Sequence, residues 1–429
     1  MTRDLVVLIG DRVAGRLSQH PSDRAQLRFT YDDTYRYGPD PTPLSLSMPI
    51  QTPVHPAEVI TPWLWGLLPD NAAVLQRWAR SFQISASSPF AFLATPVGED
   101  CAGAVRFITP ERLDDARRRS GSVEWLDDDA LAARVRELRA DATAWFGQDA
   151  TGRFSLAGAQ AKTALLHRDG RWGVPSGDIP TSHILKPAIT GLDEHDLNEH
   201  LCLSAARICG LTVASSRILR FGAERVVAVE RFDRLTGSDG TRRRVHQEDI
   251  CQALGVPPDL KYQSEGGPGP AAVAALLRAR IPEPATGPDL LRFADALIYN
   301  WLIGGTDAHA KNYALLLAGS RVRLAPLYDL GSALPYPGMH VRKLRLAMKF
   351  GGSYSMLPPG PGLWPKVAAE LSLPLDDVLS RARYLVDRIG DAFQTAARDP
   401  AVAGLGSTLP QRLLDAVAQR AADCSRSLP

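Results

Sequence analysis

The sequence predicts an α+β protein with two lobes, a cleft between them, and a smaller α+β unit in front of both. The chain has 429 residues, which is more than one hydrophobic core usually serves. Residues 163–230 carry short apolar runs separated by turn signals, as strands do. Residues 246–429 carry apolar positions mainly at helical spacing, which predicts an all-helical lobe apart from one strand pair. A β-rich segment followed by an α-rich one favours two lobes, and small ligands usually bind in the cleft between lobes.

The composition is that of an ordinary globular protein, with 45% hydrophobic and 22% charged residues. The net charge of +2 gives no global excess of positive charge that would drive binding to nucleic acid or to a membrane. The five cysteines show neither a CxxC pair nor metal-ligand spacing, so reduced thiols and a cytoplasmic location are expected. Leu5–Ile9 is a short run beside Asp4 and predicts a strand, not a signal peptide. No run approaches the roughly 20 apolar residues that a membrane span needs, so no membrane association is expected.

Residues 1–110 are expected to form the N-terminal α+β subdomain. Apolar, Trp-bearing sequence between Ala57 and Phe82 predicts helices, and two prolines predict breaks near Pro62 and Pro69. The strands expected in this part are Leu5–Ile9, Val13–Leu17, Leu27–Tyr31 and Asp100–Phe107.

Residues 111–235 are expected to form the β-rich lobe. The charged stretch Arg112–Asp129 predicts a solvated connection into a helix over 129–146. Asp169-Gly170 between two apolar runs is the strongest hairpin signal in the chain. A helix is expected at Asn198–Gly210, where the glycine ends it. The strands expected here are Thr163–His167, Arg171–Val174, Ser182–Lys186, Val213–Phe221 and Arg225–Glu230.

Residues 236–429 are expected to form the helical lobe, and one loop in it carries unusual chemistry. An apolar helix is expected at Leu290–Ile303, and the strand pair at Tyr313–Leu317 and Val322–Leu327. Between that helix and the first strand lies the loop GGTDAHAKN, residues 304–312. Asp, His, Lys and Asn side chains at such a junction are unusual unless a ligand uses them.

Two acids and an amide in this lobe point to phosphoryl transfer. Asp307 and Asn312 have the Asp-x-x-x-x-Asn spacing of the protein-kinase catalytic loop, and Asp329 follows the next strand pair, as the second metal-binding Asp of kinases does. Asp307 would take the proton of the acceptor hydroxyl, while Asn312 and Asp329 would supply the hard oxygen ligands that magnesium prefers. Asp and Asn are also common turn formers and helix caps. The joint spacing, with strands in between, favours kinase chemistry.

A kinase also needs a lysine for the nucleotide phosphates and often an acid that holds it. Lys186 ends a predicted strand, and Glu199 on the following helix is a plausible partner. Alone, Lys186 would be an ordinary solvated strand end, so the order lysine, acid, Asp-x-x-x-x-Asn, Asp is the signal. His309 would orient Asp307, contact phosphate or make a structural hydrogen bond. Lys311 would contact phosphate or lie on the surface.

Two further segments suit a nucleotide cleft. VERFD, residues 229–233, ends a strand where the lobes should join, and its backbone would bind adenine. FSLAGAQ, residues 154–160, precedes the hairpin and would fold over the phosphates. It is neither a Walker loop nor GxGxxG, so by itself it is a weak phosphate signal. The nucleotide-site residues predicted from these segments are Glu230, Arg231, Phe232, Ala157, Gly158, Ala159 and Gln160.

Several longer strings resemble those of the HipA family of bacterial toxin kinases. In the N-terminal part they are LSLSMPI (44–50), GLLPDN (66–71) and DCAGAVRF (100–107). In the rest of the chain they are FSLAGAQAKTALL (154–166), VERFDR (229–234), HQEDICQALG (246–255), KYQSEGGPG (261–269), NWLIGGTDAHAKN (300–312) and LYDLGSA (327–333). They occur in the family's order and cover nearly the whole chain.

The resemblance implies a bilobed protein-kinase-like fold of the PI3/4-kinase-like type, with ATP and Mg²⁺ as cofactors. By position in the motifs, it implies that Asp307 is the catalytic base and that Asn312 and Asp329 are the metal ligands. Lys186 would be the lysine that contacts the nucleotide.

The resemblance also implies a regulatory site. Glu230 and Phe232 would lie at the adenine hinge, and Ser155 would be an autophosphorylation site. In the family, modification of this serine pulls the glycine-containing loop out of the nucleotide site and silences the kinase. A phosphate there would add negative charge beside a site built to hold the phosphates of ATP.

The partners that the resemblance implies are a HipB-like helix-turn-helix antitoxin and, through it, operator DNA. The near-neutral charge of this chain fits a protein that reaches DNA mainly through such a partner. The substrates known in the family are aminoacyl-tRNA synthetases, above all glutamyl-tRNA synthetase, whose phosphorylation arrests growth.

Two other functions remain open. One is a related kinase of another protein, lipid, sugar or other small molecule, because the acceptor pocket is not readable from the catalytic loop. The other is a non-catalytic co-repressor that uses a kinase fold as a binding module. The presence of Asp307, Asn312, Asp329 and Lys186 argues against the second.

Overall fold

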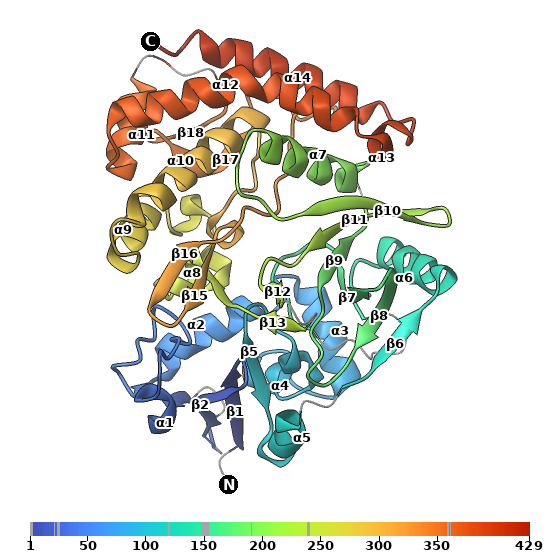
Figure 1. The fold of residues 1–429 in the computed structure, drawn as a ribbon, viewed down its shortest axis with the longest axis vertical. Helices are drawn as coiled ribbons and strands as arrows, with labels where there is room; N and C mark the ends of the chain where they lie inside the picture. The colour runs from blue at the N-terminus through green and yellow to red at the C-terminus, as the bar shows by residue number, and fades with distance from the viewer. Residues whose placement is uncertain are drawn as a thin grey trace.

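The computed structural model confirms the α+β class and the bilobed arrangement with an N-terminal subdomain. It describes residues 3–20, 22–23, 26–118, 121–146, 154–189, 191–237, 241–357, 360 and 362–429. In Figure 1 the N-terminal subdomain lies at the bottom, the largest sheet lies beside it, and the C-terminal helices form the opposite end. None of the helices in these ranges is long and apolar enough to span a bilayer.

The N-terminal subdomain is an antiparallel sheet covered by helices, with strand order β4-β3-β2-β1-β5. In β3 the side chains of Leu27, Phe29 and Tyr31 are buried while those between them are exposed, so alternation directs one face to the core. The strands are β1 (Arg3–Ile9), β2 (Arg12–Gln19), β3 (Leu27–Tyr31), β4 (Val54–His55) and β5 (Val105–Ile108). The helices are α1 (Asp33–Arg36), α2 (Ala57–Leu67), α3 (Ala72–Phe82), α4 (Pro89–Leu93) and, after β5, α5 (Leu113–Arg117).

The expected helix break near Pro62 is wrong, whereas the break near Pro69 is confirmed. Helix α2 continues through Pro62. Proline removes one backbone hydrogen bond there, but Trp63, Leu64 and Leu67 are completely buried, and their packing holds the helix together. The helix ends before Pro69, as the restricted backbone of the preceding residue requires.

The central sheet has six strands in the order β10-β11-β9-β7-β8-β6. The predicted hairpin at Asp169-Gly170 is confirmed, and both residues have the positive φ that such a turn requires. Helix α6 (Asp128–Ala140) packs on this sheet and ends earlier than expected, and α7 (His195–Ile208) follows β9 in sequence. The strands are β6 (Val123–Leu126), β7 (Thr163–Arg168), β8 (Arg171–Pro175), β9 (His183–Lys186), β10 (Ser216–Phe221) and β11 (Glu224–Glu230). Strand β6 lies within the stretch that was expected to be a solvated connection.

The C-terminal lobe contains more β structure than the expected single strand pair. Strand β14 pairs with β15 and completes a three-stranded sheet, although its sequence, HQED, has no apolar residue that would signal a strand. The additional strands are β12 (Arg234–Thr236), β13 (Arg242–Arg244), β14 (His246–Asp249), β17 (Arg345–Phe350) and β18 (Ser353–Ser355), beside the expected β15 (Ala314–Ala318) and β16 (Arg321–Leu324). The helices are α8 (Ile250–Leu254), α9 (Pro270–Arg280), α10 (Thr286–Ile303), α11 (Leu363–Leu371), α12 (Leu375–Ala397), α13 (Pro400–Ala403) and α14 (Leu409–Ser425).

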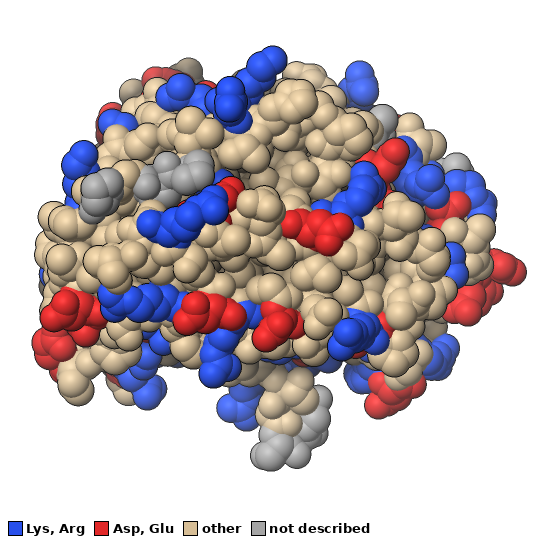
Figure 2. All heavy atoms as spheres, turned by 90° about the horizontal axis from the view of Figure 1, so that it is seen from above, with Lys and Arg blue, Asp and Glu red and all other residues tan. Residues whose placement is uncertain are grey.

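Helix α7 joins the sheet to the helical lobe. Its apolar residues belong to the same core as those of α10, α12 and α14, and in Figure 1 it lies directly beneath α12 and α14. The outer face formed by these C-terminal helices carries both basic and acidic side chains, interspersed without a large patch of one sign (Figure 2). This face therefore offers no single-sign field for a charged partner.

The N-terminal subdomain docks on the helical lobe through Glu248 of β14. One carboxylate oxygen of Glu248 accepts a hydrogen bond from the Leu46 amide at 2.8 Å, and the other accepts one from Trp63 Nε1 at 3.3 Å. Burial raises the pKa of Glu248 to about 7. The joint between the two parts therefore favours a protonated carboxyl below neutral pH.

A raised pKa predicts a defined pH dependence of stability. Between about pH 4.5 and 7, Glu248 is protonated in the folded chain and charged in the unfolded one, so the free energy of unfolding falls as pH rises through this window. In chemical denaturation, we expect wild type to lose about 2 kcal/mol between pH 5 and pH 7.5 relative to a Glu248→Gln variant. Glu124→Gln on strand β6, where the side chain is exposed, controls for the loss of one negative charge. If the free energy of unfolding of wild type differs from that of Glu248→Gln by the same amount at pH 5 and at pH 7.5, the prediction is contradicted.

Candidate active site

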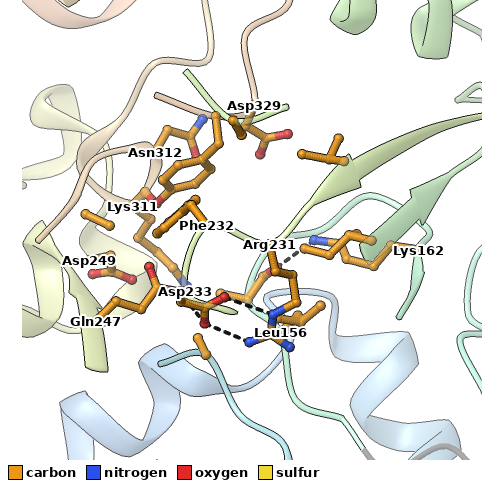
Figure 3. A pocket seen from close by; sticks show the side chains of 18 of the residues that line it. Leu156, Lys162, Arg231, Phe232, Asp233, Gln247, Asp249, Lys311, Asn312 and Asp329 are labelled. Atoms are coloured by element: carbon orange, nitrogen blue, oxygen red, sulfur yellow. Dashed lines mark hydrogen bonds and ion pairs between the residues drawn. The ribbon is translucent and has the colours of Figure 1, made fainter. Parts of the chain in front are cut away.

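A cavity of about 930 Å³ lies where the three parts of the chain meet. Its lining includes the loop 156–158, the end of β9, the segment 229–233 at the end of β11, strand β14 and the loop 309–312. Figure 3 shows Asn312 and Asp329 at one end of this cavity and Asp233 and Gln247 toward the other. The predicted nucleotide-site residues that line it are Ala157, Gly158, Lys186, Glu230, Arg231, Phe232, His309, Lys311, Asn312 and Asp329.

A second cavity of about 1350 Å³ adjoins the first. Asp307, Ala159 and Gln160 line this second cavity and not the first. The residues common to both are Gly158, Lys162, His309, Asn312 and Asp329. The predicted set therefore surrounds two connected spaces, and the three side chains that the sequence singled out, Asp307, Asn312 and Asp329, do face one shared cavity.

The predicted ion pair between Lys186 and Glu199 is confirmed, with Lys186 Nζ 2.8 Å from Glu199 Oε1. Lys186 Nζ also lies 2.5 Å from Asp329 Oδ1. Burial alone would lower the pKa of Lys186, but the two carboxylates outweigh it and raise that pKa above its usual value. Burial would raise the pKa of Asp329, but the ammonium of Lys186 outweighs it and holds the pKa below its usual range. Lys186 and Asp329 therefore remain charged at neutral pH.

The loop after α10 is ordered by its own backbone. Helix α10 ends where Gly304 adopts φ +70°, a left-handed conformation that glycine takes without strain. The carbonyl of Asp307 accepts hydrogen bonds from the His309 amide at 2.8 Å and from Asn312 Nδ2 at 2.7 Å. The nitrogen end of the Asn312 amide is thus turned to the loop backbone, and its oxygen is left for another partner. Asp307 itself is exposed at the mouth of the second cavity.

Asp329 has an unusual backbone, with φ +58°. Few residues other than glycine adopt this region, and where they do, surrounding contacts usually impose it. The neighbouring Tyr328 supplies one such contact, since its hydroxyl donates to the Lys311 carbonyl at 2.7 Å. Strain of this kind is found often at functional sites.

The segment after β11 lies where the hinge was expected. The Arg231 amide donates to the Ser182 carbonyl at 2.9 Å, which fixes the backbone against β9. The ring centroids of Phe232 and Tyr328, which both line the first cavity, lie 5.4 Å apart. The side chain of Glu230 is exposed. The side chain of Arg231 is buried and bonded to Asp233, so only its backbone and stem are available to a ligand.

The loop 154–160 is folded into the cleft. Ser155 is completely buried, and its hydroxyl donates to the Leu67 carbonyl at 2.7 Å. Its amide donates to the Asp100 carbonyl at 3.0 Å, so the segment lies along the N-terminal subdomain. Gly158 has φ +100°, and its carbonyl accepts a hydrogen bond from the Asp70 amide at 3.2 Å.

Comparison with known proteins identifies the family. The model of the HipA-like C-terminal domain matches residues 154–397, and the model of the HipA N-terminal domain matches residues 5–108. The chain belongs to the HipA family.

Two relatives and one solved structure are similar to this HipA-family chain. It is 34% identical to Y4mE of Sinorhizobium fredii, which is named as a kinase, over 96% of both chains. It is 29% identical to the serine/threonine-protein kinase toxin HipA of Shewanella oneidensis, over 78% of this chain and 76% of that protein. A solved structure from Shewanella oneidensis, of HipA and HipB with operator DNA, covers 99% of both chains with a TM-score of 0.79 and 23% identity, which shows a shared fold.

Sequence reasoning missed two charged residues of the HipA-family site, Lys162 and Asp70. Lys162 lines both cavities, donates to the Ala157 carbonyl at 2.6 Å, and has a pKa lowered to about 8 by burial and by the charge of Lys186. Asp70 of the N-terminal subdomain pairs with Lys261 at 2.9 Å and with Lys311. Lys311 is therefore not a surface residue, and its contact with phosphate stays a prediction. Lys162 and Asp70 lie in the family-like strings AQAK and LLPDN, and these strings were their only indication in the sequence. No spacing pattern pointed to either residue.

The residues present fit a magnesium ion held together with a nucleotide. No group of three or more His, Cys, Asp or Glu side chains that could hold a metal alone occurs in the parts of the chain described. Asn312 and Asp329 would supply two oxygen ligands, and Mg²⁺ commonly takes its remaining ligands from phosphates and water. Two buried polar atoms at the first cavity, Glu199 Oε2 and His309 Nδ1, have no hydrogen-bond partner, as expected where a ligand or water completes a site.

Removing Lys186 should be costly, because Glu199 and Asp329 would then lose the cation that is hydrogen-bonded to both of them. We expect Lys186→Met to lower the free energy of unfolding by about 3 kcal/mol without nucleotide, as measured by chemical denaturation. Arg139→Met, which breaks an ion pair to Glu224 from an arginine that is 54% exposed, should cost less than about 1 kcal/mol. If Lys186→Met and Arg139→Met lower the free energy of unfolding by similar amounts, the ion pairs of Lys186 contribute no more to stability than an exposed ion pair does.

Proposed function

We propose that this HipA-family chain is an ATP- and Mg²⁺-dependent serine/threonine protein kinase that acts as a growth-arresting toxin in the cytoplasm. One observation carries the proposal. Lys186, Asp329 and Asn312 line one cavity, and Asp307 lines the space that adjoins it at Asn312 and Asp329. A terminal phosphate there would lie between metal-type ligands on one side and a carboxylate base on the other.

Different residues of the cleft would bind different parts of the nucleotide. The backbone of 230–232 would bind adenine, while Lys186 would hold the phosphates by charge, kept in place by Glu199. The residues proposed to cover the phosphates are Ala157, Gly158, Ala159 and Gln160 of the loop and His309 of the second cavity's wall. Lys311 contributes by fixing the catalytic loop to Asp70.

The transfer step needs one proton acceptor. The acceptor hydroxyl gives its proton to the Asp307 carboxylate while its oxygen forms a bond to the γ-phosphorus, and the bond from that phosphorus to the β–γ bridging oxygen breaks to release ADP. When bound, Mg²⁺ would neutralise phosphate charge between Asn312 and Asp329. Asp329 remains available as an anionic ligand at neutral pH because Lys186 keeps its pKa low.

Ser155 is proposed as the autophosphorylation site. Its complete burial leaves no room for a phosphate in the present position of the loop. The modified segment would therefore have to leave its place beside Asp100 and Leu67, and Gly158 would leave the cavity with it. This supports silencing of the kinase by self-modification.

The proposed partner is a HipB-like helix-turn-helix antitoxin that carries the chain to operator DNA. The Shewanella structure of HipA with HipB and operator DNA supports it, since that HipA shares this fold. The mixed charge of the C-terminal face and the net charge of +2 also fit indirect DNA binding. The proposed substrate is an aminoacyl-tRNA synthetase, with glutamyl-tRNA synthetase first.

The decisive experiment combines phosphotransfer with ATP binding. Incubation with radiolabelled ATP, Mg²⁺ and a full set of purified aminoacyl-tRNA synthetases should label one synthetase. An Asp307→Asn variant should lose this labelling by at least about 100-fold while binding ATP with unchanged affinity, because it removes the base and leaves the first cavity intact. It should also lose growth inhibition. Retained growth inhibition would favour a non-catalytic co-repressor, and labelling of a small molecule alone would favour a different kinase.

Self-labelling tests the regulatory site. Ser155→Ala should abolish incorporation of phosphate into the chain while phosphotransfer to its substrate continues, because the hydroxyl is lost without a change of charge. Ser182→Ala is a matched control, since Ser182 is a buried serine on the neighbouring strand segment. Phosphopeptide mass spectrometry checks the position, and phosphate retained in the Ser155→Ala chain would exclude this serine as the main site.

A further inference from the structure

The motif KYQSEGGPG, residues 261–269, has no role in the function derived so far, yet it reaches the catalytic loop. The hydroxyl of Tyr262 donates to Asp307 Oδ1 at 2.5 Å. Among the residues that the structure describes, Tyr262 is the one side chain bonded to this carboxylate. The backbone of Asp307 is held by two hydrogen bonds from the loop itself, so Tyr262 decides the orientation of its side chain.

We propose that Tyr262 is a positioning residue for the base, its hydroxyl holding one oxygen of Asp307 so that the other oxygen is presented to the acceptor. This inference rests on the proposed kinase function and deepens it on the acceptor side. Tyr262 lines the second cavity together with Asp307 and does not line the nucleotide cavity. It therefore acts on the acceptor's base and leaves nucleotide binding untouched.

The phenol is suited to be a permanent donor. Burial, and then the hydrogen bond to Asp307, raise the pKa of Tyr262 well above its usual value, so the hydroxyl keeps its proton at any physiological pH. The ring lies edge-on to His309, with the centroids 5.0 Å apart, which fixes its direction. During transfer the acceptor's proton goes to the free oxygen of Asp307, and Tyr262 neither gains nor loses one.

The rest of the motif holds Tyr262 in place. The carbonyl of Tyr262 accepts hydrogen bonds from the Glu265 and Gly267 amides, both at 3.0 Å, which close a compact turn. The turn requires glycine, since a Cβ on Gly267 would lie 2.0 Å from the Leu260 carbonyl oxygen. The carbonyl of Lys261 accepts from the Ala310 amide at 3.2 Å, so the turn is fastened to the catalytic loop beside Asp307. These bonds explain why the string has this composition.

The test separates the hydroxyl from the ring. Tyr262→Phe keeps the packing on His309 and removes only the donor. We expect the kcat for phosphotransfer to fall about tenfold with the KM for ATP unchanged, as for the loss of one hydrogen bond to a charged group. Tyr35→Phe, whose hydroxyl bonds the Thr42 carbonyl in the N-terminal subdomain, should leave both measurements unchanged.

Three outcomes would overturn the inference. If Tyr262→Phe keeps the kcat of wild type while Tyr262→Ala is impaired, the ring only packs and its hydroxyl does not position the base. If kcat falls, ATP binds more weakly and the melting temperature drops as well, the hydroxyl supports the fold rather than the base. A wild-type chain that transfers phosphate to no acceptor, itself and water included, would overturn the proposed function, and the inference would fall with it.

Discussion

The cleft depends on one buried ion cluster that binds the N-terminal subdomain to the hinge. Asp100 of the subdomain accepts from Arg234 at 2.9 Å and also pairs with Arg231 and Arg244, while Asp233 pairs with Arg231 at 2.8 Å. Three guanidinium groups and two carboxylates are thus withdrawn from water, and burial together with the charge of Arg231 lowers the pKa of Arg234 to about 10. A buried charge that loses its partner is strongly unfavourable, so the subdomain cannot leave the hinge without a large cost. The cluster fixes where the segment 229–233 lies, and the nucleotide cavity is built on that segment.

The same subdomain enters the catalytic centre at a second point. Asp70 binds Lys261 and Lys311, and its amide holds the Gly158 carbonyl, so one residue connects the loop over the cleft with the catalytic loop. Burial would raise the pKa of Asp70, but Lys311 and Lys261 outweigh it and keep the pKa low, so the contact is ionic at physiological pH. The N-terminal subdomain is therefore a structural part of the candidate site. A change in that subdomain would reach both the loop over the cleft and the loop 304–312.

The sequence predicted those parts of the candidate site whose residues lie close together in the chain. Asp307 and Asn312 lie five positions apart in one loop, and the Lys186–Glu199 pair follows from a strand leading into a helix, so local patterns were sufficient. Lys261 meets Asp70 across 191 positions, and Tyr262 meets Asp307 across 45. No periodicity or spacing rule reports such contacts, because they depend on how the subdomains dock. Strand β14 was missed for a related reason: its residues are polar, and burial of His246 and Glu248 by tertiary partners overrides their low strand propensity. The roles proposed for the individual site residues remain predictions.

If Ser155 is modified as proposed, its buried position would delay the modification. Its hydroxyl lies behind the N-terminal subdomain, bonded to the Leu67 carbonyl, and no reagent reaches it until the segment opens. If the opening costs about 4 kcal/mol, about one molecule in a thousand is open at any moment. The observed rate of modification would then be about a thousandth of the rate at which the open segment reacts. Modification of Ser155 would therefore be slow even in a chain whose transfer step is fast.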